Sequence, residues 1–171
     1  MVMRGTPFIL VLVLVLATVS ACVQSDIASS EPPPDADSNF FRCEVQPVIA
    51  ARCSFMECHG SAERAMPIFA EQRYRLGISW DDYETPLTAD ELAENFRVVR
   101  GFFARPGETY DLLSEKPLDT RAGGLFHRGK DLYGRDDVFL TRDDAGYAAL
   151  RKFIDGATAD PSCEPTEEVG L

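Results

Sequence analysis

The first 21 residues constrain the chain most, because they leave only the remainder for a folded domain. They contain one basic side chain, Arg4, followed by an apolar run over residues 8–17 and then small residues. An apolar run of about ten residues is too short to cross a bilayer and has the length of the hydrophobic region of a secretory signal. We therefore expect residues 1–21 to be an export signal outside the fold.

Cys22 directly follows the small residues Val19-Ser20-Ala21. This arrangement resembles the lipobox of bacterial lipoproteins, in which the cysteine after the cleaved signal carries the lipid. The resemblance implies lipidation at Cys22 and a periplasmic or cell-surface location. Residue 23 is Val rather than Asp, and by analogy with such lipoproteins this residue favours an outer-membrane location. The alternatives are an ordinary signal peptide cleaved after Ala21 and an uncleaved anchor.

Residues 22–38 are predicted to form a flexible linker. They are rich in Ser, Asp and Pro and include three consecutive prolines at positions 32–34. Such a composition cannot bury enough apolar surface to form a core. The folded domain is therefore expected over residues 39–163, with a short tail over 164–171. A domain of about 120 residues is large enough for a single hydrophobic core.

The charge of the chain excludes one class of partner. It has 28 Asp and Glu against 17 Lys and Arg, a formal net charge of −11. Binding to nucleic-acid phosphates needs a face rich in Lys and Arg, so we expect no nucleic-acid partner. The negative charge also disfavours electrostatic binding to an anionic membrane surface. The lipid anchor is therefore the expected contact with a membrane. The acidic surface would suit a basic redox partner protein.

Hydrophobic periodicity predicts four helices and no convincing strand, so the expected fold class is mainly α. The first helix would take Ser38 as its N-cap and be disturbed by Pro47, which cannot donate a backbone hydrogen bond. The second begins with a capping-box pattern at residues 88–91. The third is expected at about 108–115 and the fourth at about 143–155.

A long loop with four glycines separates the last two expected helices, over residues 117–140, and contains His127. A loop of this length without secondary structure is unusual in a small domain and is commonly functional. His127 is therefore a candidate site residue, and the alternative is a solvated loop histidine.

Two cysteines and a histidine lie together in Cys53-Ser54-Phe55-Met56-Glu57-Cys58-His59-Gly60. A cysteine pair with a histidine directly after the second cysteine is the attachment pattern of c-type haem. The two thiols add to vinyl groups on one edge of the porphyrin, and the adjacent histidine becomes the proximal iron ligand. Here four residues separate the cysteines instead of the usual two, a C-x4-C-H variant that occurs in some multihaem cytochromes. The motif predicts one covalent haem c on Cys53 and Cys58, with His59 on the iron.

Two other interpretations of this motif stay open. Cys53 and Cys58 could form a disulfide in an oxidising compartment, leaving His59 at the surface. Zinc could also use such closely spaced cysteines. An adjacent Cys-His pair, however, does not easily direct both side chains to one tetrahedral ion.

The segment over residues 45–53, followed by Cys58-His59-Gly60, resembles the opening of planctomycete-type cytochrome c domains, in which a helix leads into the haem-binding cysteine pair. Further similar residues lie in the C-terminal half, at Lys116-Pro117-Leu118, Gly123-Gly124, His127, Asp144, Tyr147, Leu150, Phe153, Ile154 and Gly156-Ala157. The resemblance covers most of residues 40–157. It implies a small cytochrome c-like helical domain with long loops, one haem and an electron-transfer role.

The sixth iron ligand has several candidates. His127 is distant in sequence and lies on a Gly-rich loop that can approach closely, so it is favoured. Met66 is the alternative, although it follows His59 by only seven residues. An open position is a third possibility. Ligation by two histidines would give a lower reduction potential than His/Met ligation, because Met raises the potential.

Cys43 and Cys163 remain, one at each end of the expected domain. Chain termini often lie close together in compact domains, so a disulfide between them is expected. It would close a loop of about 120 residues and, in the chain-entropy model, contribute about 4 to 5 kcal/mol. Two free thiols are the alternative.

The leading interpretation is therefore a monomeric, lipid-anchored monohaem cytochrome that transfers electrons. The sequence shows no carboxylate pair, Ser/His/Asp set or phosphate-binding loop that would indicate an enzyme. The alternatives are a disulfide-stapled envelope lipoprotein or binding module without haem, and a haem-based sensor with an open iron position.

Overall fold

The computed structural model describes residues 35–77, 82–104, 109–128 and 137–165. The chain divides into two compact units, Met1–Pro32 and Pro33–Leu171, and every element described below belongs to the second. The expected signal and Cys22 lie outside the described residues. Within the described ranges the regular structure is helical and no strand is present, which confirms a mainly α domain. None of the described helices has the length and apolar character needed to span a bilayer.

The first helical rod consists of α2 (Ser38–Phe40), a π-helical turn η2 (Phe41–Val45) and α3 (Gln46–Arg52). Its N-cap is Asp37, whose carboxylate accepts a hydrogen bond from the Phe40 N–H at 2.6 Å. The sequence expectation of Ser38 as N-cap is therefore wrong by one residue. Both residue types cap helices well, and the aspartate takes the position here.

Pro47 explains the π-helical turn. A proline inside an α-helix has no N–H to donate, and its ring collides with the carbonyl four residues earlier. The helix widens immediately before this proline, where the Gln46 N–H donates to the carbonyl oxygen of Phe41, five residues back. The disturbance expected from Pro47 is thus a local π turn that leaves the rod continuous.

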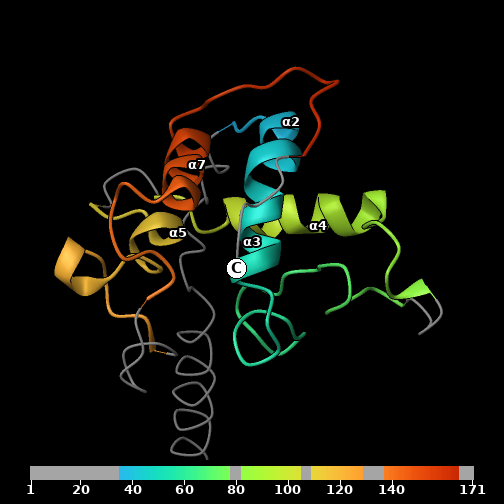
Figure 1. Cartoon of the computed structure of the whole chain (residues 1–171), viewed down its shortest axis with the longest axis horizontal. Coiled ribbons are helices and arrows are strands. Elements are labelled where there is room, and N and C mark those ends of the chain that lie inside the picture. Colours follow the sequence, from blue (N-terminus) through green and yellow to red (C-terminus); the bar gives the residue numbers. More distant parts are fainter. Residues whose placement is uncertain (1–34, 78–81, 105–108, 129–136, 166–171) are drawn as a thin grey trace, which may run out of the picture. The chain divides into compact units, whose positions relative to one another are not determined.

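The second helix, α4 (Ala89–Arg100), begins as its sequence predicts. The hydroxyl of Thr88 accepts the Glu91 N–H, and the Glu91 carboxylate accepts the Thr88 N–H, which is a complete capping box. In Figure 1, α4 crosses behind the first rod. Phe96 of α4 packs edge-on against Phe41, with ring centroids 5.4 Å apart.

The third helix is shorter than expected. Helix α5 (Leu112–Glu115) is capped by Asp111, whose carboxylate accepts the N–H groups of Leu113 and Ser114. Residues 105–108 are outside the described part of the chain. The expected start at residue 108 is therefore wrong, because the aspartate at position 111 is the residue that supplies the cap.

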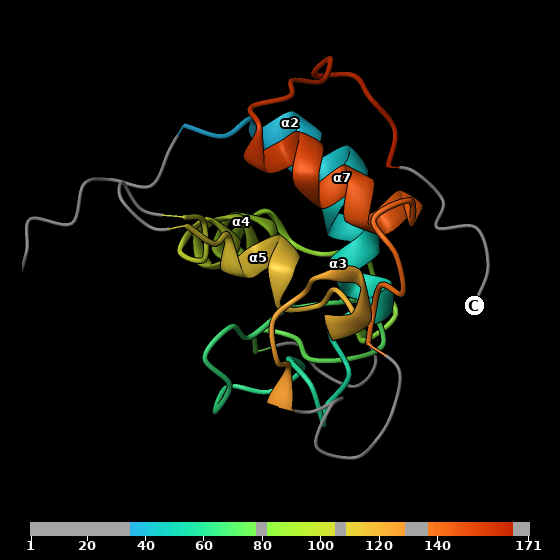
Figure 2. The same cartoon turned by 90° about the vertical axis from the view of Figure 1, so that its left-hand side faces the viewer.

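The last helix, α7 (Ala145–Ile154), runs antiparallel to the first rod. At its start, the N-cap residue Asp144 forms an ion pair with Arg52 at the end of α3, with an N–O distance of 3.0 Å. At its end, Phe153 packs against Phe40 and Phe41. Figures 1 and 2 show α7 beside α2 from two directions. These aromatic rings form the centre of the hydrophobic core.

The segment over residues 117–140 is partly ordered by its own ends. Leu118 and Phe139 form an isolated parallel bridge, in which the Asp119 N–H donates to Phe139 and the Phe139 N–H donates to Pro117, each at 2.9 Å. A short 3-10 helix, η4 (Thr120–Ala122), follows the first bridge residue. The bridge closes the long loop at its base, so the loop is less irregular than its composition predicts.

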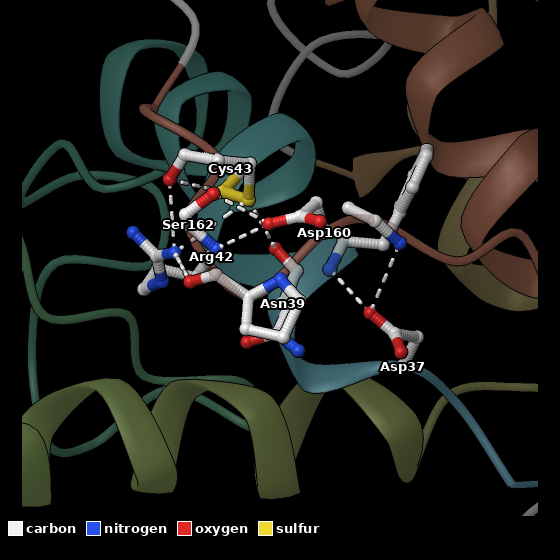
Figure 3. The surroundings of a disulfide bond; sticks show 10 residues. Asp37, Asn39, Arg42, Cys43, Asp160 and Ser162 are labelled. Atoms are coloured by element: carbon white, nitrogen blue, oxygen red, sulfur yellow. Dashed lines mark hydrogen bonds between the residues drawn. A yellow bond between two sulfur atoms is a disulfide. The ribbon is translucent and has the colours of Figure 1, made fainter.

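The chain after α7 returns to the first rod, where a disulfide joins Cys43 to Cys163 with a Cα–Cα distance of 6.2 Å. This is the pair expected from the sequence. The guanidinium of Arg42 donates to the carbonyl oxygens of Pro161 and Cys163, and the carboxylate of Asp37 accepts the Ala159 N–H (Figure 3). The C-terminal segment is therefore attached to the first rod by hydrogen bonds between its backbone and side chains of the rod as well as by the disulfide.

Candidate functional site

The cysteine-histidine segment forms a tight loop at the C-terminal end of α3. The His59 N–H donates to the Cys53 carbonyl at 3.0 Å, and the N–H groups of Cys58 and Gly60 both donate to Phe55 at 2.8 Å. These bonds turn the chain back on itself, so that His59 lies beside the first cysteine of the motif. The four residues between the cysteines are accommodated within this turn.

This turn is so tight that only a glycine fits at position 60. A Cβ atom at Gly60 would lie 2.1 Å from the carbonyl oxygen of Ser54 and 2.9 Å from the carbonyl carbon of Phe55. Both contacts are to backbone atoms, which cannot move aside without opening the loop. The glycine after the histidine therefore has a steric role in holding the motif closed.

Arg73 holds the start of the loop against α3. Its guanidinium donates to the carbonyl oxygens of Ala50 and Ala51, which lie in the last turn of the helix, and to the hydroxyl of Ser54 at 2.8 Å. The same guanidinium lies over the Phe55 ring, 3.9 Å from its centroid. Arg73 thus satisfies helix-terminal carbonyls that have no partner within the helix, and it fixes the backbone around Cys53.

The two cysteines differ in exposure. Cys53 is buried, with 8% of its surface exposed, and Cys58 is half-buried. No disulfide joins Cys53 to Cys58. Met56 between them is largely exposed, whereas Met66, the alternative sixth ligand, is buried and belongs to the hydrophobic core.

The structure brings His59 and His127 together. Their ring centroids are 6.3 Å apart and their ring planes are inclined by 24°. One ring comes from the loop after α3 and the other from the long loop between α5 and α7. Two of the sequence-predicted site residues that are far apart in the chain are therefore neighbours in space.

Backbone contacts carry His127 to this position. The Leu125 N–H donates to the carbonyl of Glu115 at 2.7 Å, and the Lys116 ammonium donates to the carbonyl of Phe126 at 2.9 Å. Gly124 passes so close to Leu118 that a Cβ atom there would lie 1.8 Å from the Leu118 carbonyl oxygen. The glycine permits the approach, and the following hydrogen bonds fix the chain up to His127.

The surroundings of His59 lower the pKa of its imidazole. Burial lowers the pKa of His59, and the charges of His127 and Arg64 lower it further, while the backbone of Met66 acts in the opposite direction. The Nδ1 atom of His59 is buried without a hydrogen-bond partner among the described residues. A lowered pKa keeps the imidazole neutral at neutral pH, which is the form that binds a metal.

Asp137 lies next to His127. The distance from Nδ1 of His127 to Oδ1 of Asp137 is 3.6 Å, and the Asp137 side chain is only 2% exposed. The sequence analysis did not identify Asp137. Nothing in the local sequence distinguishes it from the neighbouring Asp136, and only the fold shows which carboxylate is beside the histidine.

Other features of the described residues do not compete with this site. Two surface hollows, with volumes of about 430 and 390 Å³, are lined by residues away from the motif, such as Tyr110 and Arg142 in the first and Glu44 and Lys152 in the second. Within residues 35–77, 82–104, 109–128 and 137–165, no group of three or more His, Cys, Asp or Glu could hold a metal ion.

The separation of the two imidazoles can be compared with that of two imidazoles bound to one metal ion. Two nitrogen–metal bonds of about 2 Å each place the centroids of the two ligating rings about 6 Å apart. The observed centroid separation of 6.3 Å has this size. In comparisons with known proteins, no family model, curated protein or solved structure matches the chain.

Proposed function

We propose that the protein is an exported, lipid-anchored c-type cytochrome with a small cytochrome c-like domain and one covalent haem. Cys53 and Cys58 would hold the haem through thioether bonds, and His59 and His127 would ligate its iron. Cys22 would carry the lipid at the periplasmic or cell-surface face of a membrane, with the outer membrane favoured. The protein would be a monomeric electron carrier rather than a substrate-transforming enzyme.

The observation that carries this proposal is the pairing of the two histidines. The chain contains only two histidines. One directly follows the second cysteine of the attachment motif, and the other lies 6.3 Å away between ring centroids. This separation has the size that two imidazoles bound to one iron would have.

The haem, when bound, supplies an iron that accepts and releases one electron. The residues of the chain have the tasks of orienting it and excluding water. Arg73 and Gly60 hold the attachment loop rigid through the contacts described above. Burial keeps His59 neutral and ready to ligate. A fixed ligand geometry in both oxidation states limits the rearrangement that accompanies electron transfer, which suits an electron carrier.

The deciding experiment asks whether haem is covalently attached. The full chain is expressed in a host with a working cytochrome maturation system, denatured, and analysed by intact mass and by peroxidase staining. We expect the polypeptide to carry the mass of one haem. The variant with Cys53→Ala and Cys58→Ala should lose it, while Cys43→Ala with Cys163→Ala, a matched removal of two other cysteines, should retain it.

A bare polypeptide from that host would contradict the proposal. It would favour a disulfide-stapled envelope lipoprotein without haem, for which the Cys43–Cys163 bond supplies the staple. If haem is present, carbon monoxide binding to the reduced protein separates the remaining alternatives. An electron carrier with two histidine ligands should not bind it readily, whereas a sensor with an open iron position should.

A further inference from the structure

Asp137 is a buried carboxylate that lies beside His127 and shortly before the bridge that closes the long loop. Its side chain is 2% exposed, and its Oδ1 atom is 3.6 Å from Nδ1 of His127. The parallel bridge between Leu118 and Phe139 fixes the backbone two residues after it. The carboxylate is thus held next to the histidine by the closure of the long loop.

A carboxylate is costly to bury without a positive or hydrogen-bonding partner. One positive partner within reach of Asp137 is a protonated His127, whose Nδ1 lies 3.6 Å from Oδ1, a distance for an ion pair and longer than a hydrogen bond. Histidines that bind metals commonly donate the N–H of their other ring nitrogen to a carboxylate, which fixes the tautomer and orientation of the ring and makes it a stronger ligand. The Nδ1 of His127 faces the carboxylate, so Nε2 is the nitrogen left for a metal.

We propose that Asp137 is a positioning residue that pairs with Nδ1 of His127, directs Nε2 toward the haem iron and lowers the reduction potential of the haem. This inference rests on the proposed function. The negative charge beside the ligand favours the oxidised iron, which carries one more positive charge than the reduced iron. Hydrogen bonding around a ligand is one of the means by which a protein sets the potential of a haem.

The test is a redox titration of the full-length holoprotein with Asp137→Asn, which keeps the size of the side chain and removes its charge. We expect the reduction potential to rise. At one fixed potential, the ratio of reduced to oxidised protein should increase at least tenfold, which is about 59 mV for a one-electron couple. Asp137→Glu, which keeps the charge, should restore the ratio at least in part.

Asp111→Asn is the matched control. Asp111 is also buried, and it caps α5 without contacting either histidine. An asparagine still caps a helix, so this variant should leave the potential unchanged. An Asp137→Asn potential equal to that of the wild type, or a rise of the same size in Asp111→Asn, would overturn the inference.

A double variant tests whether the effect passes through His127. In a His127→Ala background, Asp137→Asn should change the potential much less than it does alone. An undiminished effect would show that the carboxylate acts as a general charge, and the inference would be wrong. If Asp137→Asn fails to fold, nuclear magnetic resonance of the reduced wild type replaces it. A slowly exchanging Nδ1 proton on His127 supports the inference, and a rapidly exchanging or absent one overturns it.

The two proposals fail in different ways. A wild-type protein without covalent haem would remove the proposed function and this inference with it. A wild-type protein with covalent haem whose potential is insensitive to Asp137 would remove the inference alone.

Discussion

The imidazole rings of His59 and His127 lie with their centroids 6.3 Å apart, although neither residue is part of a regular helix or strand. Each ring is brought there by a loop that is fixed through its own backbone. The first loop turns back at Gly60, and the second is closed by the bridge between Leu118 and Phe139. The two loops that bear the candidate site residues are therefore held by close backbone contacts at their bases.

Replacing His127 by Ala should alter the visible spectrum of the reduced protein, because the iron would lose its sixth ligand. Covalent attachment should persist, since Cys53 and Cys58 are untouched. Met66→Leu is the control, because leucine suits the core position that Met66 occupies and cannot ligate iron. A spectrum that changes in Met66→Leu and not in His127→Ala would assign the sixth position to Met66.

Replacing Gly60 by Ala should destabilise the attachment loop. The added Cβ atom would lie 2.1 Å from the Ser54 carbonyl oxygen, and such overpacking typically costs about 1 to 3 kcal/mol. Urea unfolding should show the loss, and haem loading should fall because the added atom opens the attachment loop itself. Gly101→Ala is the comparison, because a Cβ atom there would lie 3.1 Å from the Val98 carbonyl oxygen, a milder overlap that a small shift relieves, so its loss of stability should be smaller. Equal stability of Gly60→Ala and the wild type would show that the loop is not closed as described.

Stability should fall in acid through the buried ion pair of Glu91 with Arg75, whose side chains are 0% and 1% exposed. Burial alone raises the pKa of Glu91, but hydrogen bonds from Arg75, Leu76 and Thr88 lower it to about 2. Because the pKa of Glu91 in the folded protein lies below its ordinary value of 4.5, the contribution of Glu91 to stability is complete above about pH 4.5. It is lost as the pH falls toward 2, which unfolding midpoints measured across this range will follow.

Glu91→Gln should remove much of that acid dependence and leave Arg75 buried without its carboxylate. Breaking a buried pair in this way costs about 3 to 5 kcal/mol. Glu94→Gln is the matched control, since Glu94 pairs with Arg97, which is 70% exposed, and an exposed pair contributes about 0 to 1 kcal/mol. Similar losses in both variants would contradict the importance given to burial.

Removing the disulfide should destabilise the domain strongly. Cys43 and Cys163 are 120 positions apart, and closing a loop of this length contributes about 4 to 5 kcal/mol in the chain-entropy model. The variant with both cysteines replaced by Ala should therefore unfold at lower urea concentration than the wild type. A reductant should bring the wild type to the stability of the variant and leave the variant unchanged. A wild type that is indifferent to the reductant would contradict the bond.

Local sequence was sufficient where a short pattern determines a structure by itself. The capping box formed by Thr88 and Glu91 is read from four residues and is present as predicted. It was insufficient where neighbouring residues compete for one position, as Asp37 and Ser38 do for the first N-cap. The π turn is a third case. Pro47 predicts that the first helix is disturbed, but it does not predict that the disturbance is a π turn.

The sequence likewise predicted some residues of the candidate site and could not predict others. Cys53, Cys58 and His59 form a contiguous motif that needs no fold to be recognised. His127 was a candidate because it lies in a Gly-rich loop. That it lies next to His59 depends on contacts between segments that are distant in sequence. Asp137 could not be predicted as a site residue, because only the structure shows that its carboxylate lies 3.6 Å from His127.

The covalent link between Cys43 and Cys163 also decides what a protease can release. A single cut anywhere between these residues would leave two fragments joined through their sulfur atoms. If Cys22 carries the lipid, the N-terminal fragment stays in the membrane and retains the C-terminal fragment with it. A nicked molecule would then remain cell-associated and unchanged in size on a non-reducing gel, and shedding would require a reductant as well as a protease.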